Sequence, residues 1–159
     1  MSGNRREKSK AFLLIFYSIV VSVFILDQIS KHLILQSFTF GESYPLWDPF
    51  LYLTLAQNRG IAFGLFRHAS GILMVLITIS LLVLTWMSAS MQKLPPMVRV
   101  AFAFILGGAF GNWVDRMRFG YVVDFIDVRI WPIFNFADTF ISVGAGLYLL
   151  HLIRTRNLP

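Results

Sequence analysis

Cysteine is absent from this 159-residue sequence. Its absence excludes disulfide bonds, a thiol nucleophile and any zinc site built on cysteine. Only three histidines are present, His32, His68 and His151, and they are too far apart in the chain to make a metal-ligand spacing. We therefore expect a protein with no bound metal and no cofactor.

Charge is also scarce. Charged residues make up 14% of the chain, against roughly 25% in a typical soluble domain. Hydrophobic residues make up 57%, more than the interior of one small domain can bury, so we expect the excess to face lipid. The net charge of +6 could indicate nucleic acid or a membrane. Because the basic residues flank apolar runs, the sequence favours a membrane protein that does not bind nucleic acid.

Four segments approach the 20 or so apolar residues that cross a bilayer. The sequence therefore predicts an all-α membrane protein, a single domain over residues 1–159, with helices at about 11–35, 69–91, 96–115 and 134–153. The first segment follows basic residues, as a cleaved signal peptide would. Its length, its polar end from Asp27 to Lys31 and the lack of a small-residue cleavage site argue against cleavage.

Two connecting segments lie on the side opposite the termini. Residues 37–66 contain the β-rich run Leu51–Leu55, followed by Asn58 and by Gly60, which favours a turn. We expect a small β-sheet on the membrane surface there, and an outer loop over about 116–133.

Lysine and arginine in short flanks set the orientation of a membrane protein. Basic residues precede the first predicted helix, lie between the second and third, and follow the fourth: Arg5, Arg6, Lys8, Lys10, Lys93, Arg99, Arg154 and Arg156. With four crossings these sites share one side, so we expect both termini to be cytoplasmic.

The chain has only eight acidic residues, and this topology places most of them at the outer side. Five aspartates fall at one depth: Asp27, Asp115, Asp124, Asp127 and Asp138. An ionisable group in a membrane is costly and usually has a partner or a function. For Asp27, an ion pair with Lys31 and a functional role are equally good interpretations. A structural role is the simpler interpretation for Asp115, in packing or an ion pair with Arg116, and for Asp127, with Arg129 on a solvated loop face. Asp124 and Asp138 lie among apolar neighbours, which favours a functional role.

The candidate catalytic groups can be reduced by elimination. Ser30 and Lys31 could suggest a serine–lysine pair, but adjacent helical residues do not face each other. What remains is a carboxylate pair, in which one group keeps a proton while the other activates water. A small proton-coupled transporter and a non-catalytic assembly factor remain as alternatives, although the acids gather at one face and line no path between the two faces.

Five blocks carry a resemblance to a known family. They are Asp27–Lys31, Asn58–Phe63, Gly107–Arg116, Val122–Phe125 and Phe134–Asp138. With these five blocks in this order, the sequence resembles bacterial lipoprotein signal peptidase. This family, also called signal peptidase II, consists of aspartyl endopeptidases of the inner membrane. The resemblance implies a prolipoprotein substrate carrying a diacylglyceryl cysteine, cleavage just before that cysteine, and inhibition by globomycin. We also expect contact with membrane lipid and a monomeric enzyme.

The resemblance also assigns roles. Asp124 and Asp138 match the family's catalytic pair, a choice that position alone leaves open among five aspartates. The residues expected to bind substrate or support the site are Asp27, Lys31, Asn58, Gly60, Asn112, Arg116 and Asn135. Asp115 matches as well, with a structural role.

Overall fold

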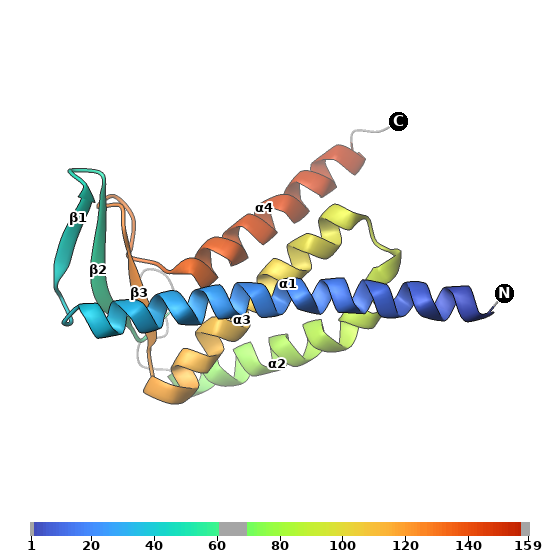
Figure 1. The fold of residues 1–159 in the computed structure, drawn as a ribbon, viewed down its shortest axis with the longest axis horizontal. Helices are drawn as coiled ribbons and strands as arrows, with labels where there is room; N and C mark the ends of the chain where they lie inside the picture. The colour runs from blue at the N-terminus through green and yellow to red at the C-terminus, as the bar shows by residue number, and fades with distance from the viewer. Residues whose placement is uncertain (1, 61–69, 157–159) are drawn as a thin grey trace.

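The computed structural model describes residues 2–60 and 70–156. Four long helices and a small sheet follow one another along the chain (Figure 1). The elements are α1 (Ser2–Ser37), β1 (Ser43–Trp47), β2 (Leu51–Asn58), α2 (Ser70–Ser88), the short 3-10 helix η2 (Ala89–Lys93), α3 (Pro96–Phe119), β3 (Val122–Asp127) and α4 (Phe136–Arg156).

Four helical stretches of the described chain are long and apolar enough to cross a membrane: Ser9–Ser37, Met74–Lys93, Pro96–Phe119 and Phe136–Arg156. This confirms the predicted all-α membrane architecture with a small sheet. Local signals set the ends of α3. Pro96 stands at its start, where a missing N–H costs nothing, and Gly120 ends it in the left-handed conformation, with φ of 76°.

The predicted outer loop over residues 116–133 is wrong in part. Residues 116–119 continue α3, and Val122–Asp127 form strand β3, which pairs antiparallel with β2. The sheet order is β1-β2-β3. Valine, phenylalanine and isoleucine favour extended structure here. The predicted β element over 37–66 is described as far as residue 60, and its remaining residues lie outside the described part of the chain.

Helix α3 lies between α1 and α4, and small residues bring the three together. Gly107 lies against Val20 and Val23 of α1, and Gly108 lies against the backbone of Ala137 and the side chain of Ile141 on α4. Glycine permits such close approach of helices within a membrane. These contacts hold α3 close to both neighbouring helices.

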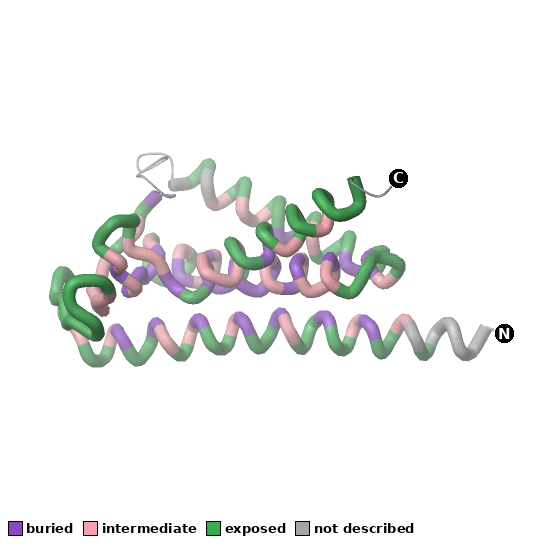
Figure 2. The backbone as a smooth tube through the Cα atoms, turned by 90° about the horizontal axis from the view of Figure 1, so that it is seen from above, coloured by how far each residue is buried: buried purple, intermediate pink, exposed green. Residues whose placement is uncertain are grey.

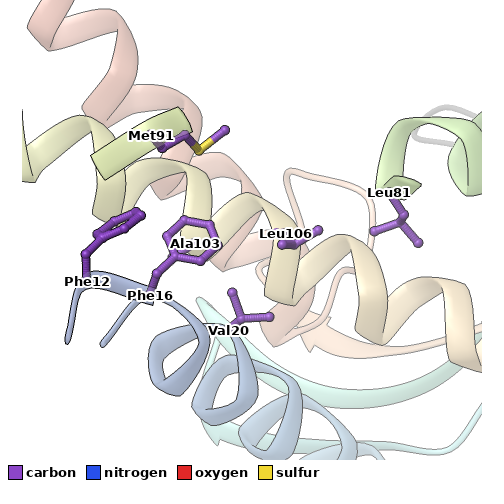
Figure 3. Packing of buried hydrophobic residues seen from close by; sticks show 7 residues of the cluster. All are labelled: Phe12, Phe16, Val20, Leu81, Met91, Ala103 and Leu106. Atoms are coloured by element: carbon purple, nitrogen blue, oxygen red, sulfur yellow. The ribbon is translucent and has the colours of Figure 1, made fainter. Parts of the chain in front are cut away.

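The described residues contain two clusters of buried apolar side chains. One lies toward the termini, between α1, α2, η2 and α3, and contains Phe12, Phe16, Val20, Leu81, Met91, Ala103 and Leu106 (Figure 3). The other joins the C-terminal end of α1 to the sheet and contains Ile34, Leu55, Val123 and Phe125. Along α1, buried residues recur on the side toward the other helices, while the opposite side is exposed (Figure 2).

The sheet stands at one end of the helices, and both termini lie toward the other end (Figure 1). The polar end of α1, the end of α3 and the beginning of α4 therefore meet next to the sheet. The five predicted aspartates were expected at this end of the helices.

Candidate active site

Four of the five predicted aspartates gather where three helices meet the sheet. Asp27 comes from α1, Asp115 from α3, Asp124 from β3 and Asp138 from the first turn of α4. Asp27, Asp115 and Asp124 are at most 1% exposed. Asparagine and lysine side chains join all four into one hydrogen-bonded network.

Asp127 lies outside this network. Its carboxylate accepts a hydrogen bond from Thr54 at 2.9 Å and pairs with Arg129 at 3.4 Å. The predicted ion pair is therefore present, but the predicted solvated loop face is wrong. Asp127 is only 6% exposed, because it ends β3 and pairs with Tyr52 of β2.

Asn135 positions both central carboxylates. It precedes the first residue of α4, and its Oδ1 accepts the backbone N–H of Asp138 at 2.9 Å, as a helix N-cap does. Because the carbonyl oxygen is held by the helix, the amide nitrogen points away from it and donates to Oδ1 of Asp124 at 2.6 Å. Capping α4 thus aligns Asp138 with Asp124.

The backbone adds a second connection between β3 and α4. Phe134 accepts hydrogen bonds from the N–H groups of Phe125 and Ile126, and donates to the carbonyl of Ile126. The chain entering α4 is therefore fixed against the strand that carries Asp124.

Asp124 is enclosed by protein. Its Oδ2 accepts a hydrogen bond from Asn58 at 2.9 Å, and its Oδ1 accepts the one from Asn135. The register of β2 and β3 places Ala56 opposite Asp124, so Asn58, two residues on, reaches the same face diagonally. Burial, followed by the nearby charge of Asp138, raises the pKa of Asp124 to about 7.

Asp138 has a different environment. Its residue is only partly buried, and its Oδ1 accepts a hydrogen bond from Nδ2 of Asn112 at 2.7 Å. It is the third residue of α4, where the helix dipole favours a negative charge. The site therefore offers one enclosed carboxyl with a raised pKa and one partly exposed carboxyl at a helix N-terminus.

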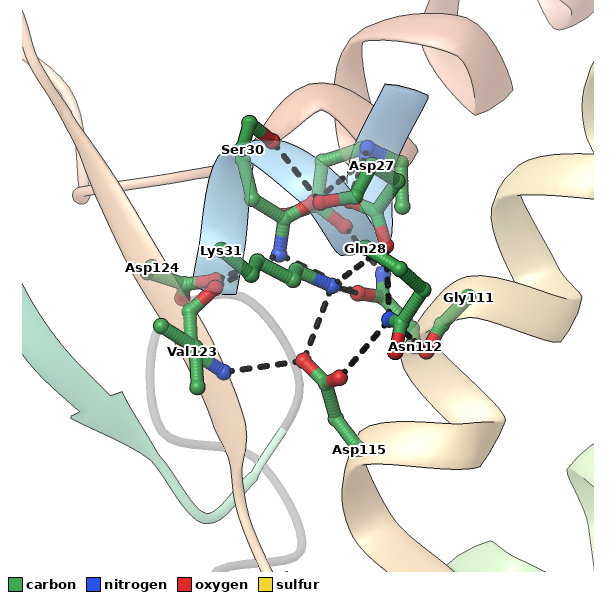
Figure 4. Close-up of polar contacts among 12 residues, drawn as sticks. Asp27, Gln28, Ser30, Lys31, Gly111, Asn112, Asp115, Val123 and Asp124 are labelled. Carbon is green, nitrogen blue, oxygen red and sulfur yellow. Dashed lines mark hydrogen bonds and ion pairs between the residues drawn. The ribbon is translucent and has the colours of Figure 1, made fainter. Parts of the chain in front are cut away.

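Lys31 occupies the centre of the neighbouring cluster (Figure 4). Its Nζ lies 2.8 Å from Asp27, 2.9 Å from Asp115 and 3.0 Å from Oδ1 of Asn112. The predicted pairing of Asp27 with Lys31 is present, whereas Asp115 pairs with Lys31 in place of its predicted partner Arg116. Asp115 also accepts the backbone N–H of Val123 at 3.1 Å, which secures β3.

The serine next to Lys31 does not take part in this cluster. The hydroxyl of Ser30 donates to the backbone carbonyl of Asp27 at 2.7 Å. The exclusion of a serine–lysine pair agrees with this geometry.

Arg116 and Gly60 close the site from the side of β2. Nη2 of Arg116 donates to the carbonyl of Gly60 at 2.8 Å, and Nη1 donates to the carbonyl of Asn112 at 3.3 Å. The N–H of Gly60 donates to Oδ1 of Asn58 at 3.1 Å, so this glycine shapes the turn that orients Asn58. Nε of Arg116 is buried and has no hydrogen-bond partner among the described residues.

Two contributors were not predicted. Gln28 donates to Asp27 at 3.2 Å and to Asp115 at 2.9 Å, and the backbone N–H of Ala137 donates to Oδ1 of Asp27 at 2.9 Å. Gln28 lies within one of the quoted motifs, which was a usable signal. The Ala137 contact joins residues 110 positions apart, and no local pattern indicates it.

The arrangement suits hydrolysis by acid and base. Asp124 can donate a hydrogen bond to a carbonyl, and Asp138 can accept a proton from water, in a setting that is largely removed from solvent. Among the described residues, no three histidine, aspartate or glutamate side chains form a group that could hold a metal ion.

Comparison with known proteins agrees with this chemistry. Residues 19–154 match the family described as "Signal peptidase (SPase) II". The lipoprotein signal peptidase of Halothermothrix orenii is 41% identical over 138 residues, which cover 86% of this chain and 93% of that protein. The lipoprotein signal peptidase of Moorella thermoacetica is 42% identical over 141 residues, covering 87% and 92%. These relatives are peptidases, so the similarity does not support a transporter or an assembly factor.

Solved structures agree on the fold. One described as a bacterial membrane enzyme has a TM-score of 0.86 and 31% identity, and the match covers 92% of each chain. A second with the same description has a TM-score of 0.79 and 32% identity, covering 89% of this chain and 94% of the other.

Proposed function

Because the chain belongs to the signal peptidase II family, a family of bacterial membrane aspartic peptidases, we propose that Asp124 and Asp138 are its catalytic pair. The observation that carries this proposal is the contrast between the two groups. Asp124 is fully buried with a raised pKa, whereas Asp138 is partly exposed at a helix N-terminus.

The contrast assigns a role to each carboxyl. Asp138 takes a proton from water, and the resulting hydroxide adds to the carbonyl carbon of the scissile peptide bond. Protonated Asp124 donates a hydrogen bond to the carbonyl oxygen as it becomes negative. The C–N bond then breaks, and the leaving nitrogen receives the proton that Asp138 took from water. Water has been added across the bond and the pair returns to its starting state.

The neighbouring polar groups support this cycle. Asn58 and Asn135 hold Asp124, and Asn112 holds Asp138. Arg116 has a donor, Nε, that no described residue uses, and we assign it to a backbone carbonyl of the substrate. Three further residues support these groups: Lys31 bonds to Asn112, Asp27 pairs with Lys31, and Gly60 bonds to Asn58.

The substrate is a prolipoprotein with a diacylglyceryl-modified cysteine, cut on the N-terminal side of that cysteine. The relatives with 41% and 42% identity are named lipoprotein signal peptidases. A signal helix and acyl chains both partition into lipid, so the substrate enters sideways from the bilayer. We propose that the enzyme works as a monomer in contact with membrane lipid and is inhibited by globomycin.

The orientation follows the basic residues. Lys10, Lys93, Arg99, Arg154 and Arg156 all lie on helix ends away from the sheet. Cytoplasmic flanks are enriched in lysine and arginine. This supports cytoplasmic termini and an active site near the outer face of the inner membrane.

The test is cleavage of a synthetic prolipoprotein by the purified full-length protein in detergent micelles. Mass spectrometry of the products should show a new N-terminus at the lipidated cysteine, and a peptide of the same sequence without the lipid should be cut far more slowly. Asp124→Asn and Asp138→Asn should each abolish cleavage, because an amide can neither take a proton from water nor supply one.

Asp48 offers a matched control. It is an exposed acid on the hairpin between β1 and β2, where it bonds to Tyr52, away from the four clustered aspartates. Asp48→Asn should cleave at the normal rate. Near-normal turnover by Asp124→Asn or Asp138→Asn, with the fold intact, would show that the pair is wrongly assigned.

A further inference from the structure

Asn112 presents its amide to the catalytic pair in one of two possible orientations. In the structure its nitrogen donates to Asp138 at 2.7 Å, and its carbonyl oxygen points the other way. With the amide turned by 180°, an oxygen would face the carboxylate and repel it. The orientation of this amide therefore decides whether Asp138 is stabilised as an anion.

Two donors meet the carbonyl oxygen of Asn112, and they are unequal. Lys31 lies 3.0 Å away and carries a positive charge. Asn135 lies 3.1 Å away, but its amide nitrogen has two hydrogens for three acceptors. It is also 2.6 Å from Asp124 and 3.3 Å from the carbonyl of Val123. Because charge-assisted hydrogen bonds are the stronger ones, Lys31 contributes most of the constraint.

Lys31 is itself fixed. It is 2% exposed, and its three N–H groups match three acceptors, on Asp27, Asp115 and Asn112. Two carboxylates pair with the ammonium, and Gln28 bridges both of them. The lysine cannot turn away from Asn112 without giving up a bond in a buried site, which is costly.

We propose that Lys31 is a positioning residue, which locks the Asn112 amide with its nitrogen toward Asp138 and so keeps the catalytic base ionised. Lys31 does not touch the reacting atoms. The inference rests on the proposed function, because it concerns the base of that catalytic pair.

Lys31 could instead act through its charge alone, so the other charges around the pair matter. Facing the pair are Arg116 and Asp115 from α3, Asp27 and Lys31 from α1, and the two catalytic groups themselves from β3 and α4. The double variant Lys31→Met/Asp115→Asn removes one positive and one negative charge. The net charge of the lysine cluster is then unchanged, while the hydrogen bond to Asn112 is lost.

The experiment is the pH dependence of kcat and KM on the lipidated substrate. For Lys31→Met and for Lys31→Met/Asp115→Asn, the acidic limb of kcat should move to higher pH by one unit or more. A shift of one pH unit is a tenfold change in the protonation equilibrium of the base, about 1.4 kcal/mol. KM should change little. Thermal unfolding in detergent reports whether each variant is folded, and the charge-balanced variant serves if Lys31→Met alone fails to fold.

Ser30→Ala is the matched control, since the neighbouring Ser30 hydroxyl bonds to the backbone of its own helix and takes no part in the cluster. Its acidic limb should stay in place. A double-mutant cycle provides the decisive comparison: in an Asn112→Ala background, Lys31→Met should produce no further shift. The inference is overturned if the acidic limb of kcat does not shift in folded Lys31 variants. It is also overturned if Lys31→Met shifts this limb equally with Asn112 and with Ala at position 112. Loss of cleavage in Asp138→Asn tests the catalytic pair independently of any Lys31 result.

Discussion

Gly108→Ala tests whether the close contact between α3 and α4 sets the catalytic geometry. A Cβ atom at residue 108 would lie 2.5 Å from the carbonyl oxygen of Ala137 and 2.9 Å from the side chain of Ile141. Ordinary contact begins at 3.4 Å, so the two helices would have to separate by about 0.9 Å. The atom that must move belongs to the residue just before Asp138.

A displacement of this size would break a hydrogen bond of the proposed site. The hydrogen bond from Asn112 to Asp138 is 2.7 Å long, and a displacement of about 0.9 Å would take it beyond the hydrogen-bond range. Overpacking should cost about 1–3 kcal/mol of stability, and a misplacement near 1 Å should lower kcat roughly 100-fold. The assay is kcat on the lipidated substrate, together with the melting temperature in detergent.

Gly146→Ala, on the facing helix α4, is the control. Nothing lies within 4 Å of a Cβ atom at that position, and alanine is the better helix former by roughly 0.5–1 kcal/mol. This variant should keep full activity and the same or a higher melting temperature. If Gly108→Ala behaves like Gly146→Ala in both measurements, the close contact does not position Asp138, and the argument from packing is refuted.

Two further predictions concern stability. The pKa of Asp124, raised from 3.8 to about 7, means that the folded state retains a proton that the unfolded chain releases. The stability of the wild-type protein should therefore fall as pH rises through this interval, and Asp124→Asn should remove that fall. The measurement is the melting temperature of both proteins from pH 4 to 8. If the two melting temperatures change with pH in the same way, the raised pKa is wrongly assigned to Asp124. Trp113 donates to Thr78 at 2.9 Å and ties α3 to α2. A cycle of Trp113→Phe and Thr78→Val should give a coupling energy of roughly 0.6–1.7 kcal/mol in unfolding experiments, and a value near zero would show that packing alone holds α2.

The helices could be predicted because each depends on local composition. Length and apolar content identify α1, α2, α3 and α4 regardless of what they contact. Strand β3 was missed because it is short and contains two aspartates, Asp124 and Asp127, which strands disfavour. Its extended form depends on pairing with β2, about 70 residues earlier in the chain, a contact that periodicity does not report.

The sequence predicted which residues form the site better than it predicted their hydrogen bonds and ion pairs. Depth along each helix grouped the aspartates correctly, apart from Asp127, whose partners Thr54 and Arg129 lie on the sheet and its adjoining loop. Depth does not say which acid meets which base, so Arg116 looked like the partner of Asp115. Three-dimensional packing gives that place to Lys31. The N-cap role of Asn135 was readable in principle, since asparagine just before a predicted helix is a known start signal.

The hydrogen bond between Asp27 and the backbone of Ala137 also has a consequence for biosynthesis. Asp27 lies on α1 and Ala137 on α4, so the ribosome adds Ala137 110 positions after Asp27. Until α4 has entered the membrane, Asp27 lacks this donor, Asn135 has no helix to cap, and Asp138 is missing from the site. We expect a nascent or truncated chain that ends before α4 to lack Asp138 and therefore the proposed catalytic pair. Such a chain should not hydrolyse the substrate until α4 has been made and inserted.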